Sequence, residues 1–148
     1  MTKKQTLKSL QIARTYHEEQ MQKIEALIYG KYEDETTTVS KRECDYGKWL
    51  YSYEEHLRDI LGSQFYDNLE VIHGNWHEQY YKIHQIYFKE EKKKGFLAKI
   101  LKENKVKPLD IEKAKVYYRE LLAITTELLR VMTSCERRIQ ALQESKFH

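Results

Sequence analysis

Apolar residues recur along this chain at alternating intervals of three and four positions, the spacing of one face of an α-helix. The first such stretch covers about residues 5–28 and is followed by Gly30, a residue type that commonly ends helices. His17 falls on the apolar stripe of this stretch and not on its polar face. We therefore predict a first amphipathic helix over about residues 5–28, with His17 turned toward the core.

A second helix is predicted after residues 31–39, a polar and β-branched stretch that is typical of a loop. Ser40 is followed three positions later by Glu43, which is the pattern of a capping box. The helix should therefore start at Ser40 and continue to about Gly62. This start places Cys44 in the first turn, where unpaired backbone N–H groups and the helix dipole favour a thiolate.

Two further helices complete the pattern. The third is predicted over about residues 64–89, and the fourth over about residues 110–144, with Asp110 as its N-cap. The connection at residues 89–110 is strongly charged and contains a candidate short helix at residues 96–101. The fourth helix carries an unbroken apolar seam from Ile111 to Leu142. We predict an all-α fold, an antiparallel four-helix bundle with a longer, part-helical connection between the third and fourth helices.

The composition agrees with a single domain over residues 1–148 and limits the classes of function. Charged residues make up 33% of the chain and Pro108 is its one proline, which suits long amphipathic helices. A net charge of +3 is too small to indicate nucleic acid as a partner. No apolar run approaches the ~20 residues that span a bilayer, and no signal peptide is recognisable. Two cysteines far apart make no disulfide framework, so we expect a cytoplasmic protein with reduced thiols.

Polar residues that can bind metal ions interrupt the apolar faces of the first three helices. His73 and His77 are four positions apart and so project from one face of the third helix. A single histidine on an apolar face is more often a hydrogen-bonded core residue than a metal ligand. Three histidines and one cysteine on three helices, however, match the donor set of a closed tetrahedral zinc site. The predicted zinc ligands are His17, Cys44, His73 and His77.

The remaining candidates have simpler explanations. His56 and His84 are expected at the rim of the bundle, and Cys135, on the regular seam of the last helix, is expected to be a buried core thiol. Trp76 is expected to pack in the core near the site. Gly74 lies within the third helix, where glycine costs about 1 kcal/mol relative to alanine. We interpret it as a point at which another helix approaches closely.

Two other metal sites of helical bundles fit the sequence less well. Glu70 and His73 form a Glu-x-x-His motif, but a di-iron carboxylate site needs two such motifs and two further glutamates. A hemerythrin-like site needs more histidines and a carboxylate four residues after one of them, and the position four after His17 is Met21. The count of carboxylates therefore disfavours iron, and the cysteine favours zinc.

The assembled motifs resemble the chemoreceptor zinc-binding (CZB) domain family. That family has a histidine on the first helix, then Cys-x-hydrophobic-Gly-x-Trp or hydrophobic, then His-x-x-x-His on the third helix. This chain has His17, the segment CDYGKW at residues 44–49 and the segment HGNWH at residues 73–77, with similar spacers. The resemblance covers about residues 10–90, and the final helix at about 110–144 carries no motif. It departs from the family at Gln20 and Tyr46, and Glu18 or Glu19 is a candidate for a supporting role.

The resemblance implies a zinc-binding sensor domain of bacterial signal transduction in the cytoplasm, not an enzyme. Such domains are attached to chemoreceptors or diguanylate cyclases, often form homodimers, and respond to zinc or to oxidation of the ligand cysteine. This chain is too short to hold a signalling hairpin or a cyclase as well, so we expect it to act through a signalling partner. Two alternatives stay open: a structural zinc site in an adaptor protein without sensing, and, less favoured, a zinc hydrolase.

Overall fold

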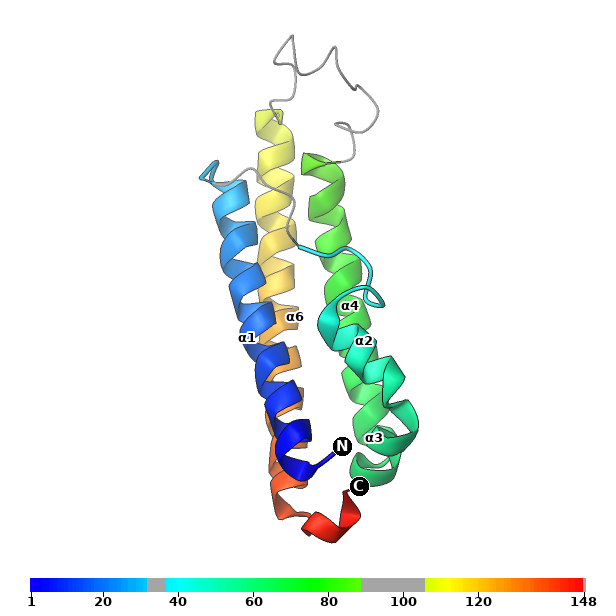
Figure 1. Cartoon of the computed structure of the whole chain (residues 1–148). Helices are drawn as coiled ribbons and strands as arrows, with labels where there is room; N and C mark the ends of the chain where they lie inside the picture. Colours follow the sequence, from blue (N-terminus) through cyan, green and yellow to red (C-terminus); the bar gives the residue numbers. More distant parts are fainter. Residues whose placement is uncertain (32–36, 89–105, 148) are drawn as a thin grey trace.

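The computed structural model describes residues 1–31, 37–88 and 106–147, and within these ranges the regular secondary structure is entirely helical. Figure 1 shows the helices in chain order. They are α1 (Lys3–Ile28), α2 (Asp45–Ser52), α3 (Glu54–Leu61), α4 (Ser63–Tyr87) and α6 (Pro108–Ala141), followed by a 3-10 turn, η1 (Glu144–Lys146). The prediction of an all-α fold is confirmed. The predicted short helix at residues 96–101 lies outside the described residues.

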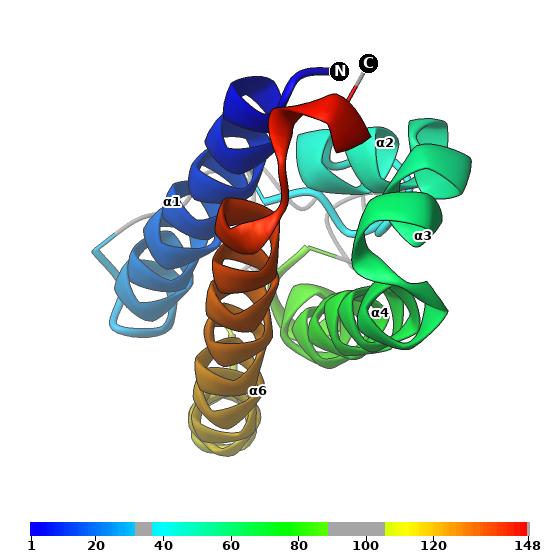
Figure 2. The ribbon, with the colours of Figure 1, turned by 90° about the horizontal axis from the view of Figure 1, so that it is seen from below.

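Three long helices and two short ones surround one core. Helix α6 packs along both α4 and α1 and runs antiparallel to them (Figures 1 and 2). The short helices α2 and α3 lie on the other side, where α2 contacts α1 and α3 contacts α4. This packing is consistent with an antiparallel four-helix bundle in which α2 and α3 together take the second position. Both ends of the chain lie at the same end of the molecule.

The first helix forms where the apolar stripe predicts it, and its ends have defined caps. Thr2 and Gln5 form a capping box, because the Thr2 hydroxyl accepts from the Gln5 N–H at 3.1 Å while the Gln5 amide oxygen accepts from the Thr2 N–H at 2.8 Å. At the other end Gly30 has φ 72°, and the N–H groups of Gly30 and Lys31 reach back to carbonyls of the last turn. This glycine-terminated end is the stop that was predicted.

The predicted start of the second helix is wrong by five residues. The Ser40 hydroxyl accepts from the Arg42 N–H at 3.2 Å, and the Ser40 carbonyl accepts from the Cys44 N–H at 3.3 Å, so residues 40–44 form a turn. We call this segment the Cys44 turn. The helix α2 begins at Asp45, with Cys44 as its N-cap. The Ser40 hydroxyl thus bonds to the Arg42 N–H of this turn and does not form the predicted capping box with Glu43.

The second helix is also not continuous to Gly62. The backbone leaves helical geometry at Tyr53, with φ −111° and ψ 22°, and α3 starts directly after it. The two halves still bury their apolar positions, since both Leu50 and Leu57 are 0% exposed. The hydrophobic spacing therefore continues across the break, and for that reason the sequence pattern does not reveal it.

The last helix starts at Pro108, and the prediction of Asp110 as its N-cap is wrong. Proline is suited to the first helical position because its missing N–H would have no helical partner there. Asp110 lies in the first turn, where a carboxylate interacts favourably with the helix dipole. The helix ends at Ala141, earlier than the predicted 144, and Lys3 Nζ donates to the carbonyls of Gln140 and Leu142 at 2.8 and 2.9 Å.

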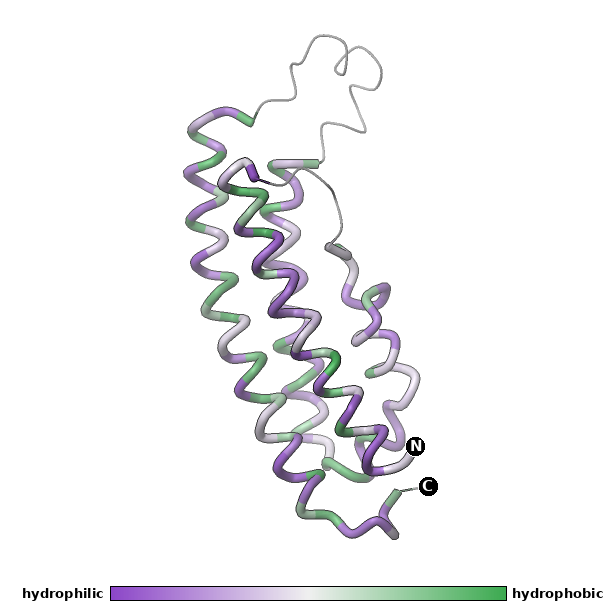
Figure 3. Tube along the Cα trace, turned by 60° about the vertical axis from the view of Figure 1, so that its left-hand side comes forward, coloured by the Kyte–Doolittle hydropathy of each residue, from purple (hydrophilic) through white to green (hydrophobic). Residues whose placement is uncertain are grey.

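The core is formed by apolar side chains from all five helices, and Figure 3 shows how apolar positions recur along the traces of the long helices. Cys135 is fully buried in this core, as predicted, and burial raises the pKa of its thiol to about 12. Trp76 is the largest fully buried side chain, and its Nε1 donates to the Thr125 hydroxyl on α6 at 2.8 Å. Among the described helices none is both long and apolar enough to cross a membrane.

Candidate metal centre

All four predicted ligand residues are buried, and the structure clusters the donor atoms of three of them, His17, His73 and His77, while Cys44 contacts this cluster only through His73. His17 comes from α1, Cys44 from the N-terminus of α2, and His73 and His77 from consecutive turns of α4. Their side chains are buried, with exposed fractions of 0%, 2%, 0% and 3% in that order. The prediction that His17 and the histidine pair face the core is confirmed, and the site lies between elements that are distant in sequence.

Three histidines form a compact group of donor atoms. One ring nitrogen from each of His17, His73 and His77 lies within 4.8 Å of the other two. The Nε2 atoms of His73 and His77 are 3.1 Å apart, and Cys44 Sγ meets this group at His73 Nε2, at 3.2 Å. Two donors bound to one tetrahedral zinc ion are separated by about 3.3–3.6 Å, as follows from the usual Zn–N and Zn–S bond lengths. The three histidines are therefore close enough to hold a metal ion.

Backbone carbonyls determine which ring nitrogens face the centre. His17 Nδ1 lies 2.8 Å from the Ala13 carbonyl, and His77 Nδ1 lies 3.0 Å from the Val39 carbonyl. A carbonyl can only accept a hydrogen bond, so in both neutral rings Nδ1 carries the proton and Nε2 presents a lone pair to the centre. His17 Nε2 is buried without a hydrogen-bond partner. An outward Nδ1–H on a carbonyl with an inward Nε2 is the arrangement of histidines that bind metals.

The protonation state of the histidines also suits a cation. Burial lowers the pKa of His17 and of His77 to about 4. Burial, and then the neighbouring His77, lower the pKa of His73 to about 2. All three rings are neutral at pH 7, so their lone pairs are available to a metal ion.

Cys44 has the hydrogen bond expected at a helix start, but burial opposes ionisation of its thiol. Its Sγ accepts from the Gly47 N–H at 3.2 Å, as an N-cap does. Burial nevertheless raises the pKa of the thiol, and this effect is larger than the lowering by the Gly47 N–H. The thiol is protonated at neutral pH in the metal-free protein, and a bound metal ion would supply the positive charge that makes it a thiolate.

Close packing around Gly47 explains why the residue three positions after Cys44 is a glycine. A Cβ atom at this position would lie 1.6 Å from the carbonyl oxygen of Lys41 and 3.4 Å from Cys44 Sγ. The Cys44 turn packs directly on the first turn of α2, and only a residue without a side chain leaves room for it. The spacing Cys-x-x-Gly thus couples the position of the thiol to the fold of the preceding turn.

Residues 37–41, which we call the strap, cross from α1 to α4 beside the cluster. The Thr37 hydroxyl donates to Gln20 Oε1 at 2.6 Å, and Thr38 hydrogen-bonds to the Tyr16 side chain, so the strap is bound to α1. On the α4 side the Val39 carbonyl accepts from His77. Gln20, which departs from the CZB pattern, is therefore an anchor of the strap.

Aromatic rings enclose the centre on its other sides. The Trp76 ring lies edge-on to His17 and His77, with centroids 4.9 and 5.0 Å apart, and the Tyr46 ring lies 4.7 Å from His73. The hydrogen bond from Trp76 to Thr125 connects this wall to α6. These aromatic walls leave the histidines and Cys44 at most 3% exposed.

Several other predictions about single residues are corrected by the structure. His84 is not at the rim but is 8% exposed, packed against Tyr80 and Phe88 at the far end of α4. His56 is half-buried beside Phe147, in agreement with the expected position at the rim. Glu18 and Glu19 are exposed on α1 and lie outside the donor cluster.

Glu70 and Gly74, on α4, have roles that the sequence did not reveal. Glu70 Oε1 accepts from Lys41 Nζ at 2.7 Å and from the Tyr51 hydroxyl at 2.6 Å, so this carboxylate is engaged in the protein itself. Gly74 faces the side chain of Lys41 and not another helix. Lys41 lies where the strap and the Cys44 turn overlap, and no local sequence pattern predicts a contact between residues 29 positions apart.

Comparisons of the chain with models of protein families, with curated proteins and with solved structures find no match. The resemblance to the CZB family therefore depends on the quoted motifs alone.

Proposed function

We propose that this protein is a zinc-binding regulatory domain in which His17, Cys44, His73 and His77 hold one Zn²⁺ ion. The observation that carries the proposal is the set of neutral histidines whose Nε2 atoms converge while carbonyls of Ala13 and Val39 accept from the opposite nitrogens. His17 Nε2 is buried without a hydrogen-bond partner, and a buried polar atom left unpaired destabilises a fold, so a cation at this point would satisfy it.

The donor set favours zinc over other metals. Imidazole nitrogens and one thiolate are the ligands of closed, four-coordinate zinc sites, whereas iron sites of helical bundles need several carboxylates. Glu70 is the nearby carboxylate of the Glu-x-x-His motif, and it is bound to Lys41 and Tyr51. The burial of all four donors, at no more than 3% exposure, supports a closed site and disfavours a hydrolase, which needs an open position for water and substrate.

The proposed role is signalling, as the resemblance to the CZB family implies. Zinc would connect α1, the start of α2 and α4 within a four-helix bundle. Loss of the metal, or oxidation of Cys44, would release the start of α2, and a homodimer partner or a signalling protein of a chemotaxis or cyclic-di-GMP pathway would detect the change. We place this activity in the bacterial cytoplasm. A structural zinc site in an adaptor protein is the second candidate, supported by the same burial.

The first test is elemental analysis of the purified protein together with Cys44→Ala and His77→Ala. Cys135→Ala and His56→Ala are matched controls, because they remove a cysteine and a histidine outside the cluster. We expect about one zinc per chain in the wild type and in both controls, and loss or weakening of binding in the two ligand variants. Zinc content that is equal in all five proteins, or absent from the wild type after supplementation, would refute the site.

A second test separates sensing from a structural role. The zinc-loaded protein is exposed to hydrogen peroxide, and zinc release is followed with a chromogenic chelator while the oxidation state of Cys44 is determined by mass spectrometry. Release in step with Cys44 oxidation supports a redox sensor. An inert Cys44, with zinc bound so tightly that a chelator cannot remove it, supports the adaptor.

A further inference from the structure

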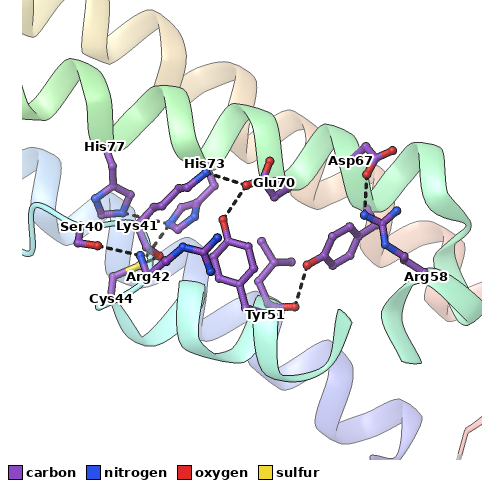
Figure 4. A network of polar contacts seen from close by, with 12 residues as sticks. Ser40, Lys41, Arg42, Cys44, Tyr51, Arg58, Asp67, Glu70, His73 and His77 are labelled. Atoms are coloured by element: carbon purple, nitrogen blue, oxygen red, sulfur yellow. Dashed lines mark hydrogen bonds and ion pairs between the residues drawn. The ribbon is translucent and has the colours of Figure 1, made fainter. Parts of the chain in front are cut away.

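A single carboxylate oxygen joins three segments next to the candidate metal centre (Figure 4). Glu70 Oε1, one turn before His73 on α4, accepts from Lys41 Nζ in the strap at 2.7 Å and from the Tyr51 hydroxyl on α2 at 2.6 Å. The guanidinium of Arg42 lies over the Tyr51 ring, 4.4 Å from its centroid. The network therefore fastens the beginning of the Cys44 turn to both α2 and α4.

Lys41 connects this network to the thiol of Cys44. Its carbonyl oxygen accepts from Cys44 Sγ at 3.6 Å and occupies the space that Gly47 leaves open. Its side chain passes over Gly74 to reach Glu70, since a Cβ at Gly74 would contact Lys41 Nζ at 3.4 Å and Cδ at 3.5 Å. Both the backbone and the side chain of Lys41 are thus held, one by α2 and the other by α4.

We propose that Glu70 is a positioning residue of the metal centre: by binding Lys41 and Tyr51 it holds the Cys44 turn so that Cys44 meets His73, and it thereby limits metal release and the access of reagents to the thiol. The part that concerns metal release rests on the proposed zinc site. The part that concerns the thiol does not, because it applies equally to the metal-free protein.

A purely electrostatic role of Glu70 makes the opposite prediction for one variant. The Lys41 ammonium is near enough to His73 and His77 to lower the pKa of both rings, so its charge disfavours a cation at the centre, and Glu70 offsets that charge. If Glu70 acted only through charge, Lys41→Met would slow metal release. If Glu70 acts by holding the turn, Lys41→Met releases the turn and accelerates metal release. Methionine keeps the apolar stem that packs over Gly74.

The experiment compares Glu70→Ala, Glu70→Gln, Tyr51→Phe and Lys41→Met with the wild type. Asp67→Ala is the matched control, because Asp67 forms a similar ion pair with Arg58 at 2.9 Å, one turn earlier on α4, without contact to the Cys44 turn. Two rates are measured: loss of Zn²⁺ to excess chelator, and alkylation of Cys44 by iodoacetamide in the metal-free protein. Peptide mass spectrometry distinguishes Cys44 from the fully buried Cys135, which serves as an internal reference.

We expect Glu70→Ala, which loses the ion pair and both hydrogen bonds, and Lys41→Met, which loses the ion pair that holds the turn, to accelerate both rates by about five- to tenfold. Tyr51→Phe, which removes one of the two, should be intermediate. Glu70→Gln keeps the acceptor and should stay within about twofold of the wild type. The alkylation rate of Cys135 should be the same in every variant. Asp67→Ala should lose Zn²⁺ and react at Cys44 at the rates of the wild type.

Unchanged alkylation of Cys44 in Glu70→Ala would overturn the proposal, as would slower metal release from Lys41→Met. Equal acceleration at Cys44 and Cys135 would also overturn it, because that result means general loosening of the fold. If the wild type binds no zinc, the proposed function fails, and the alkylation rates of the metal-free proteins still decide the role of Glu70.

Discussion

Gly47→Ala offers the sharpest test of how the Cys44 turn is built. The new Cβ would lie 1.6 Å from the Lys41 carbonyl oxygen, and real Cβ contacts are essentially never shorter than 3.0 Å, so the turn and α2 must separate by at least 3.0 − 1.6 = 1.4 Å. The opposing atom is backbone and cannot rotate away. Overpacking of this kind costs about 1–3 kcal/mol, while replacing a helical glycine by alanine recovers at most about 1 kcal/mol.

We therefore expect Gly47→Ala to lower the free energy of unfolding of the metal-free protein by about 1–2 kcal/mol. A shift of 1.4 Å also exceeds the ~0.2 Å tolerance of metal–ligand distances, so zinc affinity should fall by about 10–100-fold. Urea unfolding measures the first quantity, and competition with a chelator of known affinity measures the second.

Gly74→Ala is the matched control, a second helical glycine beside the same lysine. Its new Cβ would meet only the end of the flexible Lys41 side chain, at 3.4 and 3.5 Å, which is ordinary contact. We expect unchanged zinc affinity and up to about 1 kcal/mol of added stability. If Gly47→Ala matched the wild type in stability and in zinc affinity, the packing of the Cys44 turn on α2 would be wrong.

Three further predictions concern the whole domain. The folded-state pKa values of His17, His73 and His77 lie below the unfolded value of 6.5, so the unfolded chain binds more protons as the pH falls below 6.5. Metal-free protein should therefore lose about 1.5 kcal/mol per histidine between pH 6.5 and pH 5, and urea midpoints that do not fall over this range would contradict neutral burial. Thr37→Val removes the buried hydrogen bond to Gln20 and should cost about 1–2 kcal/mol in urea unfolding, whereas Thr126→Val, at an exposed site, should change stability by less than about 0.5 kcal/mol. Free zinc at 100 times its dissociation constant should stabilise the fold by about 2.7 kcal/mol, and a thermal midpoint indifferent to zinc would exclude the site.

Residue periodicity predicted the parts of this fold that depend on burial. The stripes of α1, α4 and α6 place His17, His73 and His77 in the interior because a helix can bury only one face, and that face is visible in the spacing. The start of α2 was not predictable in the same way. The sequence shows a cap pattern at Ser40 only, and the cap at Cys44 depends on its sulfur accepting from the Gly47 N–H, which the residue types do not indicate.

Local sequence patterns do not predict the residues that support the site. Thr37 meets Gln20 across 17 positions, and Lys41 meets Glu70 across 29 positions. In the sequence Glu70 resembled half of an iron-binding motif, and only the folded chain shows that its carboxylate is bound by Lys41 and Tyr51. Contacts of this kind depend on how the strap crosses between helices, and the spacing of apolar residues carries no information about that path.

The burial of the four donors has a consequence for timing. An ion that enters a centre with 0–3% exposed ligands must shed its hydration shell and wait for a local opening of the fold. Exchange would then be governed by the frequency of that opening and not by diffusion, so occupancy would follow a long average of the surrounding zinc concentration. The zinc content of such a centre would change only slowly after a change in zinc concentration. Oxidation of the Cys44 sulfur would need the same local opening, because Cys44 is only 2% exposed, so both signals would be limited by the motion that uncovers the centre.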